Sequence, residues 1–286
     1  MKAGVTIGCA AAMVAAAVLA VGLRHTRWTP SPLSGGEPLG ERLAVTVGRA
    51  GGMLIGAYVG GLLTIGAGGR LMMRVLAATS SDGVQGLRTE AEEVIGEVSV
   101  GGTVFLIVGV GIGAAVLGLA PYAVLRRWLP DRSVAAGLIG VAIGGGLLVR
   151  PVGLLSSANR DFTLLAPVAL AVAFCLVMLA LFGATFGVLV DHLAPRWPRP
   201  GWNVRGVVAV LPFAVLLAVP PFFVAAVAGV LAGAVAPRLR SPAMRDQPEP
   251  RDVDRAGARL GRRVIMALGG VGTISIVLAA GQVLAV

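Results

Sequence analysis

The sequence predicts an all-α fold: a polytopic transmembrane helical bundle of seven to eight membrane segments with glycine-rich helix packing. Its residues are 56% hydrophobic and 13% charged, and its mean hydropathy is +0.87. A soluble domain carries roughly 25% charged residues. The apolar residues also gather in uncharged runs that match the roughly 20 residues needed to cross about 30 Å of hydrocarbon. Both observations indicate that lipid surrounds most of the chain.

Six apolar runs qualify as membrane spans or come close. They are residues 3–23, 43–69, 98–125, 133–149, 164–190 and 264–286. We interpret the first run as a retained helix and not as a cleaved signal peptide. Lys2 alone precedes it, whereas Arg24, His25 and Arg27 follow it, which is the reverse of a signal peptide's charge distribution.

A seventh run, 206–236, is too long for one ordinary span and carries Pro212 and the pair Pro220-Pro221. Proline removes a backbone donor and clashes with the preceding turn, so the run is either a hairpin or a single kinked span. With a hairpin, the loops on one side hold 17 Lys and Arg against 6 on the other; with a single span, the split is 14 to 9. The positive-inside rule therefore favours the hairpin. The basic, cytoplasmic loops are then 24–42, 126–132, 196–205 and 237–263.

These boundaries divide the chain into three parts. Residues 1–236 form the transmembrane bundle, and 264–286 form a C-terminal transmembrane helix. Between them, residues 237–263 hold eight arginines together with several prolines and mixed acids. Such a segment cannot bury a core, so we predict a basic, flexible cytoplasmic linker that lies along the membrane surface.

The charge of the chain is positive and consists almost entirely of arginine. The formal net charge is +10, and 23 of the 24 basic residues are Arg. Because these arginines stand in short loops beside apolar runs, we expect contacts with the bilayer's anionic lipid headgroups and no nucleic-acid binding. Scarce Lys beside abundant Ala, Gly, Val and Arg indicates a GC-rich bacterial genome, and hence a multi-pass protein of the bacterial plasma membrane.

Cysteine and histidine give no sign of a disulfide, a metal site or a cofactor. Cys9 and Cys175 fall inside predicted spans, where thiols behave as small apolar groups. His25 and His192 lie at segment ends with no second ligand at a useful spacing. We therefore expect neither metal nor cofactor.

Glycines recur every four residues in the second run. Gly48, Gly52, Gly56 and Gly60 form one slowly drifting stripe along a helix. Small residues at this spacing let a second helix approach closely, so the stripe predicts a helix contact within the chain. A pore-lining or oligomer-forming role is the alternative, and the spacing alone does not decide between them.

The best candidate for a specific polar site lies between the second and third runs. Arg70 and Arg74 share a face if the second helix continues past Gly69. Thr89 and Glu92 have capping-box spacing, which predicts a helix that starts at Glu90 and continues into the third run. It would carry an acidic stripe, namely Glu90, Glu93 and Glu97.

Two interpretations of this stretch remain open. It is either the solvated end of a helical hairpin, where exposed ion pairs contribute about 0–1 kcal/mol each, or a partly buried network that organises a cavity or a partner site. Charged groups close to hydrocarbon are costly and are often functional. Arg160 and Asp161, in the loop 150–163, would lie on the same outer side and complete the candidate polar network.

The same stretch resembles a segment of uncharacterised bacterial multi-span integral membrane proteins. The similar residues are R-L-M-M-R at 70–74, T-E-A-E-E-V-I-G-E at 89–97 and G-G-T at 101–103. Arg160-Asp161-Phe162 resembles a second patch of these proteins. The resemblance implies a membrane location and no residue role, because these proteins have no activity that we can name.

Three classes of function remain. The sequence contains no Walker A loop, no H-E-x-x-H, no G-x-S-x-G and no acid in the middle of a span. These absences disfavour an enzyme and an ion-coupled transporter without excluding either. We favour a non-enzymatic scaffold or accessory subunit with a membrane protein partner. A permease or channel-like protein for a small or lipidic solute is the first alternative, and a lipid-modifying enzyme is the second.

Overall fold

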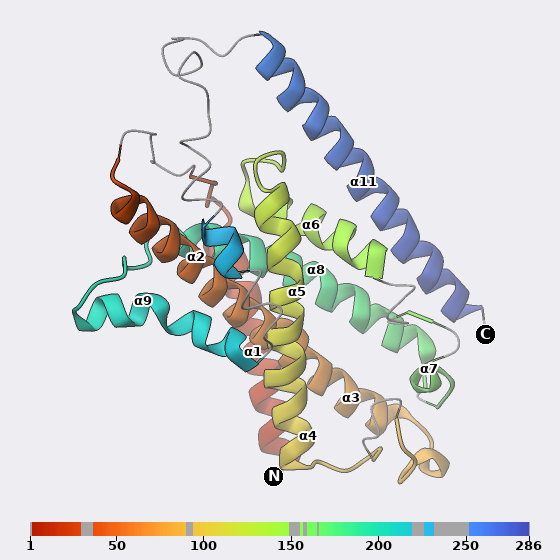
Figure 1. Cartoon of the computed structure of the whole chain (residues 1–286). Helices are drawn as coiled ribbons and strands as arrows, with labels where there is room; N and C mark the ends of the chain where they lie inside the picture. Colours follow the sequence, from red (N-terminus) through yellow and green to blue (C-terminus); the bar gives the residue numbers. More distant parts are fainter. Residues whose placement is uncertain are drawn as a thin grey trace.

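The structure is a computed structural model that describes residues 2–29, 37–89, 94–148, 155–156, 159–164, 166–218, 226–231 and 252–285. In these residues every regular element is helical apart from two isolated β-bridges (Figure 1). The prediction of an all-α fold is therefore confirmed for the described part of the chain.

The helices follow the apolar runs. Their bounds are α1 Lys2–Gly22, α2 Leu39–Gly61, η1 Leu62–Gly66, α3 Ala67–Thr79, η2 Asp82–Val84, α4 Val100–Val104, η3 Phe105–Val110, α5 Gly111–Leu125, α6 Ser133–Leu148, α7 Arg160–Leu164, α8 Val168–Leu193, α9 Val204–Ala214, η4 Val215–Ala218 and α11 Asp252–Leu284. A short helix also covers 226–231. The segments η1 and η3 are π-helical, and each continues directly into its α-helical neighbours.

Five helices are long and apolar enough to cross a membrane. They are Ala3–Gly22, Leu39–Thr79, Val100–Leu125, Val168–Leu193 and Arg259–Leu284. Helix α6 and the helical segment Val204–Leu217 are apolar but shorter. By length and composition the chain is a membrane protein.

The loops that connect the helices gather at two ends of the bundle. At the first, which we call the basic end, the amide of Trp28 donates to the Asp131 carbonyl at 3.0 Å, so the loop after α1 lies against the loop before α6. At the second, the opposite end, Thr79 Oγ1 donates to the Ala166 carbonyl at 2.8 Å. The chain thus returns to the basic end after α5, and to the opposite end after α3 and before α8.

Helix α11 begins near the basic end. A Cβ built on Gly261 would overlap the indole of Trp128, and Arg262 lies 3.7 Å from the Asp131 carboxylate. From there α11 runs along α6 toward the opposite end (Figure 1).

The glycine stripe of α2 faces the C-terminal half of α8 and the turn after it. A Cβ on Gly52 would lie 2.6 Å from the Leu193 carbonyl oxygen, and one on Gly56 would lie 2.8 Å from the Leu189 carbonyl oxygen. Gly60 approaches the Cα of Phe186 in the same way, and Gly48 approaches the Pro198 carbonyl. Glycine is required here because backbone meets backbone and no room remains for a side chain.

Close backbone approach also joins α6 to α8 and to α11. A Cβ on Gly137 would overlap the Gly183 carbonyl oxygen of α8, and one on Gly272 of α11 would overlap the Ala142 carbonyl oxygen of α6. By contrast, Gly4 and Gly8 of α1 face open space despite their four-residue spacing. Spacing alone therefore does not identify a helix contact.

The start of the last helix differs from the sequence prediction by twelve residues. Helix α11 begins at Asp252, so the last twelve residues of the predicted flexible linker 237–263 are helical. The rest of that linker and Pro220-Pro221 lie outside the described residues. Hydropathy missed the extension because arginines and acids in the first turns of a helix remain compatible with helical structure when they face water.

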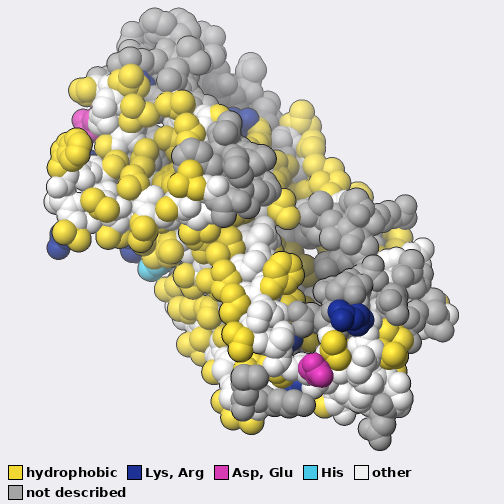
Figure 2. Space-filling model, turned by 60° about the horizontal axis from the view of Figure 1, so that its bottom comes forward, with side chains coloured by type: hydrophobic (Ala, Val, Ile, Leu, Met, Phe, Trp, Pro, Cys, Tyr) yellow, Lys and Arg dark blue, Asp and Glu magenta, His cyan; other side chains and the backbone are white. Residues whose placement is uncertain are grey.

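The surface of the described part is largely hydrophobic. Many large apolar side chains of α1, α5 and α11 are more than half exposed, among them Val18, Val124 and Ile274. Figure 2 shows hydrophobic side chains over much of one face, with few charged groups among them. In water such a surface would aggregate, whereas in a bilayer the lipid tails cover it.

Candidate functional site

The predicted polar stretch at the opposite end is built differently from the expected helix. Arg88 and Val94 pair as an antiparallel β-bridge, and the helix begins only at Val100 with Ser99 as its N-cap. Residues 94–99 are therefore not helical, and the prediction of one continuous helix from Glu90 is wrong. Gly96, inside the predicted helix, has φ +88°, which a right-handed helix does not allow.

The two arginines of this stretch do lie together, on α3. Helix α3 continues past Gly69, and Arg70 and Arg74 line a small cavity with Thr89, Ile95 and Glu97. Arg70 is buried, whereas Glu97 is exposed. Glu90 and Glu93 lie outside the described residues.

The structure pairs Arg74 with backbone and not with Glu97. Arg74 Nη1 donates to the Gly96 carbonyl at 3.4 Å, and the ion pairs of the described residues do not include Glu97. Arg160 begins α7, and Asp161 follows in its first turn, where its amide donates to Asn159 Oδ1 at 2.9 Å. Helix α7 reaches this region through Phe162, which shares a hydrophobic cluster with Ile95 and Leu76.

Because Glu97 is exposed and forms no ion pair with Arg74, the two side chains should interact only weakly. In a double-mutant cycle of Glu97→Arg with Arg74→Glu, the interaction energy should be below about 1 kcal/mol, as is typical of exposed pairs. Thermal unfolding in detergent measures the four stabilities. A double variant that recovers several kcal/mol relative to the sum of the single variants would show that the pair is coupled after all.

The most strongly organised polar cluster lies at the basic end and centres on a buried ion pair. Arg126, just after α5, places Nη2 2.8 Å from Oδ2 of Asp191 on α8, and the two side chains are 1% and 0% exposed. Arg126 Nε lies 3.1 Å from both carboxylate oxygens, and Ser133 Oγ donates to Asp191 Oδ2 at 2.6 Å. The carboxylate thus receives several charge-assisted or short hydrogen bonds, which offset part of the cost of burying it.

The same guanidinium holds the surrounding loop in place. Arg126 Nη1 donates to the Pro130 carbonyl at 2.9 Å, and its Cζ lies 5.0 Å from the centroid of the Trp28 indole ring. The other cation near this ring is Arg49, at 5.3 Å from the centroid. Two arginines therefore contact the Trp28 ring, at a separation typical of cation–π contacts. The loop after α1 is fixed to both α2 and α5 through this ring.

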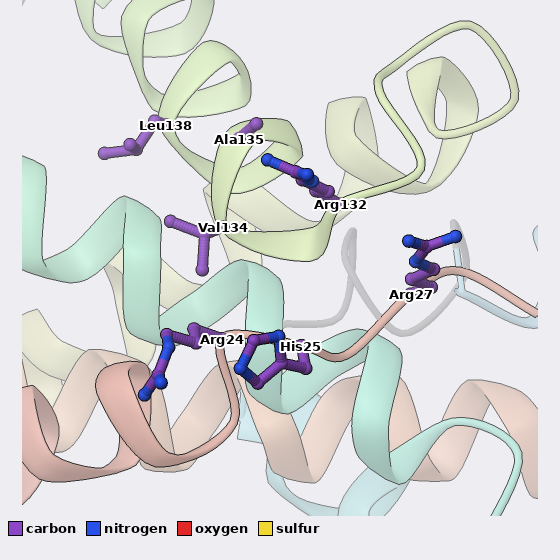
Figure 3. Close-up of a pocket in the computed structure, with 7 residues that line it drawn as sticks. All are labelled: Arg24, His25, Arg27, Arg132, Val134, Ala135 and Leu138. Carbon is purple, nitrogen blue, oxygen red and sulfur yellow. The ribbon is translucent and has the colours of Figure 1, made fainter.

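A cavity of about 550 Å³ opens beside this cluster. Its lining comes from the loop after α1 and from the start of α6, as Figure 3 shows, and consists of Arg24, His25, Arg27, Arg132, Val134, Ala135 and Leu138. The lining from the loop is therefore basic, and the lining from the α6 side is apolar except for Arg132. The four basic side chains are exposed, and no carboxylate in the described part of the chain forms an ion pair with any of them.

Arg27 and Arg132 are held opposite each other by the backbone. They form an antiparallel β-bridge, flanked by the Trp28–Asp131 hydrogen bond and by a second one from the Ser133 amide to the Thr26 carbonyl at 3.2 Å. In such a pair the Cα atoms lie about 4.5 Å apart, and directly opposed like charges are destabilising. The fold therefore concentrates positive charge at the mouth of this cavity.

Arg42 belongs to the predicted basic loop 24–42 but lies inside the protein. It is in the first turns of α2 and is 0% exposed, and its three guanidinium nitrogens have no hydrogen-bond partner among the described residues. One charge of this loop therefore does not reach the lipid headgroups.

The sequence did not identify the Arg126–Asp191 pair. Each residue stands one position outside an apolar run, 98–125 or 164–190; Arg126 falls in the predicted basic loop 126–132, and Asp191 was assigned no role. A signal was present, because both runs end on the same side of the membrane in every topology that the sequence allowed. Two opposite charges at the same depth, each at the end of a span, are a reasonable basis for predicting a pair.

No protein-family model matches the chain, and neither a curated protein nor a solved structure matches it. Inferences about its function therefore rest on the residues described above.

Proposed function

We propose that the chain is a non-enzymatic scaffold or accessory subunit of a bacterial plasma membrane, which holds a membrane protein partner. The observation that carries the proposal is the close packing of the helices. Backbone meets backbone between α2 and α8, between α6 and α8, and between α6 and α11. Such contacts favour a rigid bundle over one that opens and closes around a solute.

The position of the large cavity supports the same proposal. Its lining residues come from one end of the bundle, and Leu138 among them is 39% exposed on the surface of α6. A solute pathway would instead require a polar cavity that reaches the middle of the membrane.

The test begins with the intact protein purified from its native membranes in a mild detergent. A scaffold should retain one membrane protein at constant stoichiometry, and deletion of its gene should reduce the abundance of that partner. Proteoliposomes that contain the purified chain should show the same stopped-flow osmotic response to glycerol as empty liposomes. A protein-dependent response, together with the absence of any stoichiometric partner, would overturn the proposal.

The permease remains a second candidate because of two facing π-helical segments. The segments η1 and η3 pack together: a Cβ on Gly66 of η1 would lie 2.9 Å from the Cα of Ile107 of η3. Thr64 is fully buried and donates to the Gly60 carbonyl at 2.6 Å. Single π-helical turns inside α-helices are frequent at functional sites. The osmotic assay above distinguishes this candidate from the scaffold.

We also propose eight membrane segments, with residues 206–236 as a hairpin. The start of α11 beside Trp128 and Asp131 supports this topology, because it returns the chain to the end that α9 leaves. Reporter fusions after Arg132 and after residue 250 should then both report the cytoplasm, and a fusion near Gly83 should report the outside. If the first two fusions report opposite sides, one kinked span replaces the hairpin.

A further inference from the structure

We propose that the cavity between the loop after α1 and the start of α6 binds one anionic phospholipid. Its phosphate would lie at the basic part of the lining, beside Arg27 and Arg132, and its acyl chain would lie along Val134 and Leu138. This assignment is independent of whether the protein is a scaffold or a permease. The lipid would bind at one defined site, in addition to the general attraction between loop arginines and headgroups.

The positive charge of the lining favours an anionic ligand. The four basic side chains that line the cavity have no carboxylate partner in the described part of the chain, and the Arg27–Arg132 bridge places two of them at directly opposed backbone positions. A protein that places like charges directly opposite each other loses stability unless an anion lies between them. A phosphate diester offers two oxygens to such a pair and forms the short charge-assisted bonds that guanidinium groups favour.

The apolar part of the lining favours a lipid over a soluble anion. Val134, Ala135 and Leu138 occupy the first two turns of α6, so the cavity extends from the loop onto the start of an apolar helix. Figure 3 shows the basic side chains on the loop after α1 and at Arg132, with Val134 and Leu138 further along α6. A soluble anion would use only the basic part of this cavity, whereas a phospholipid uses both parts. The amphipathic lining therefore indicates a lipid.

The rigidity of the lining favours binding. Arg126 binds the carbonyl of Pro130, contacts the Trp28 ring and is locked by Asp191, so both walls of the cavity are attached to one buried ion pair. A site whose walls are fixed before binding loses little conformational entropy when the ligand enters. Surface arginines on mobile loops would lack this advantage.

The experiment uses the purified full-length protein in a neutral detergent, stripped of lipid. Dioctanoyl phosphatidylglycerol, dioctanoyl phosphatidylcholine, glycerol 3-phosphate and inorganic phosphate are titrated separately while thermal unfolding is recorded. We expect phosphatidylglycerol alone to raise the melting temperature with saturation. An equal rise with phosphatidylcholine would remove the charge selectivity, and an equal rise with inorganic phosphate or glycerol 3-phosphate would show a soluble-anion site; either result overturns the proposal.

Two double variants locate the site. Arg27→Gln with Arg132→Gln should weaken the apparent affinity for phosphatidylglycerol at least about tenfold, because two charge-assisted contacts are lost. The matched control is Arg199→Gln with Arg205→Gln, which removes two exposed arginines of the same end that do not line the cavity. The control should bind as the unmodified protein does, and equal weakening by both double variants would overturn the assignment.

The sign of the stability change gives a check that a misfolded variant could not imitate. Without lipid, Arg27→Gln with Arg132→Gln should melt at a higher temperature than the unmodified protein, because the opposed charges are gone. With saturating phosphatidylglycerol the order should reverse. A variant that melts lower in both conditions would show that the two arginines serve the fold and not a lipid.

Discussion

Replacing Asp191 by Asn should reduce the free energy of unfolding by about 3–5 kcal/mol, the cost of leaving one partner of a buried ion pair unpaired. The carboxylate is 0% exposed and accepts from Arg126 and Ser133 at 2.6–3.1 Å. The amide is nearly the same size, so no cavity forms. The loss would come from the uncompensated guanidinium of Arg126.

Equilibrium unfolding in mixed detergent micelles measures this change, and abundance in membranes provides a second reading. The matched control is Asp131→Asn. Asp131 lies 3.7 Å from Arg262, but the two side chains are 74% and 54% exposed, so this pair should contribute less than about 1 kcal/mol. If both substitutions cost the same, the Arg126–Asp191 pair is not buried as the structure places it.

A double substitution separates the cost of an unpaired buried charge from the cost of altered packing. When both partners of a buried pair are replaced by apolar residues of similar volume, the result is often neutral or stabilising. Arg126→Met with Asp191→Leu should therefore be more stable than Asp191→Asn alone. The polar contacts of Arg126 with Pro130 and Trp28 would still be lost, so the cavity beside them should become less rigid.

The second large effect is expected for Gly52→Leu and Gly56→Leu. Each new Cβ would lie 2.6–2.8 Å from a carbonyl oxygen of α8. Rotation of the new side chain cannot relieve a clash with the backbone, so α2 and α8 would have to separate. We expect at least the 1–3 kcal/mol that overpacking typically costs, together with a marked loss of the folded protein from membranes.

The control for this series is Gly8→Leu on α1. Gly8 is exposed and a Cβ there meets nothing within 4 Å, so leucine should be tolerated and should add helix propensity. Gly60→Ala is a graded test, since its Cβ would approach the Phe186 Cα at 3.2 Å and requires only a small shift. Equal thermal stability of all these variants would show that the stripe does not form the α2–α8 interface.

The helices could be predicted because hydropathy reports directly on the lipid environment. The run 98–125 corresponds to Val100–Leu125, and 133–149 corresponds to α6. What could not be predicted is which helices are neighbours. The stripe on α2 indicated that a helix packs there, but only the structure identifies α8, and the same four-residue spacing at Gly4 and Gly8 gives no contact.

The helix predicted to start at Glu90 was wrong for a local reason. Its spacing of glutamates matches a helix, but Gly86 and Gly96 take up positive φ and the backbone pairs across from Arg88 to Val94. Helical periodicity in nine residues is weaker evidence than two glycines that permit a turn. The role of Asp191 could not be predicted for a different reason. A charged residue at the end of a span has the sequence pattern of a loop residue, and only the structure identifies its partner.

The helix Leu39–Thr79 is a continuous rod of 41 residues. At 1.5 Å per residue it is about 60 Å long, twice the thickness of the hydrocarbon core. Transmembrane helices tilt by at most about 40°, at which this rod still rises about 45 Å along the membrane normal. Some turns of this rod therefore lie beyond the lipid tails, at one end or at both.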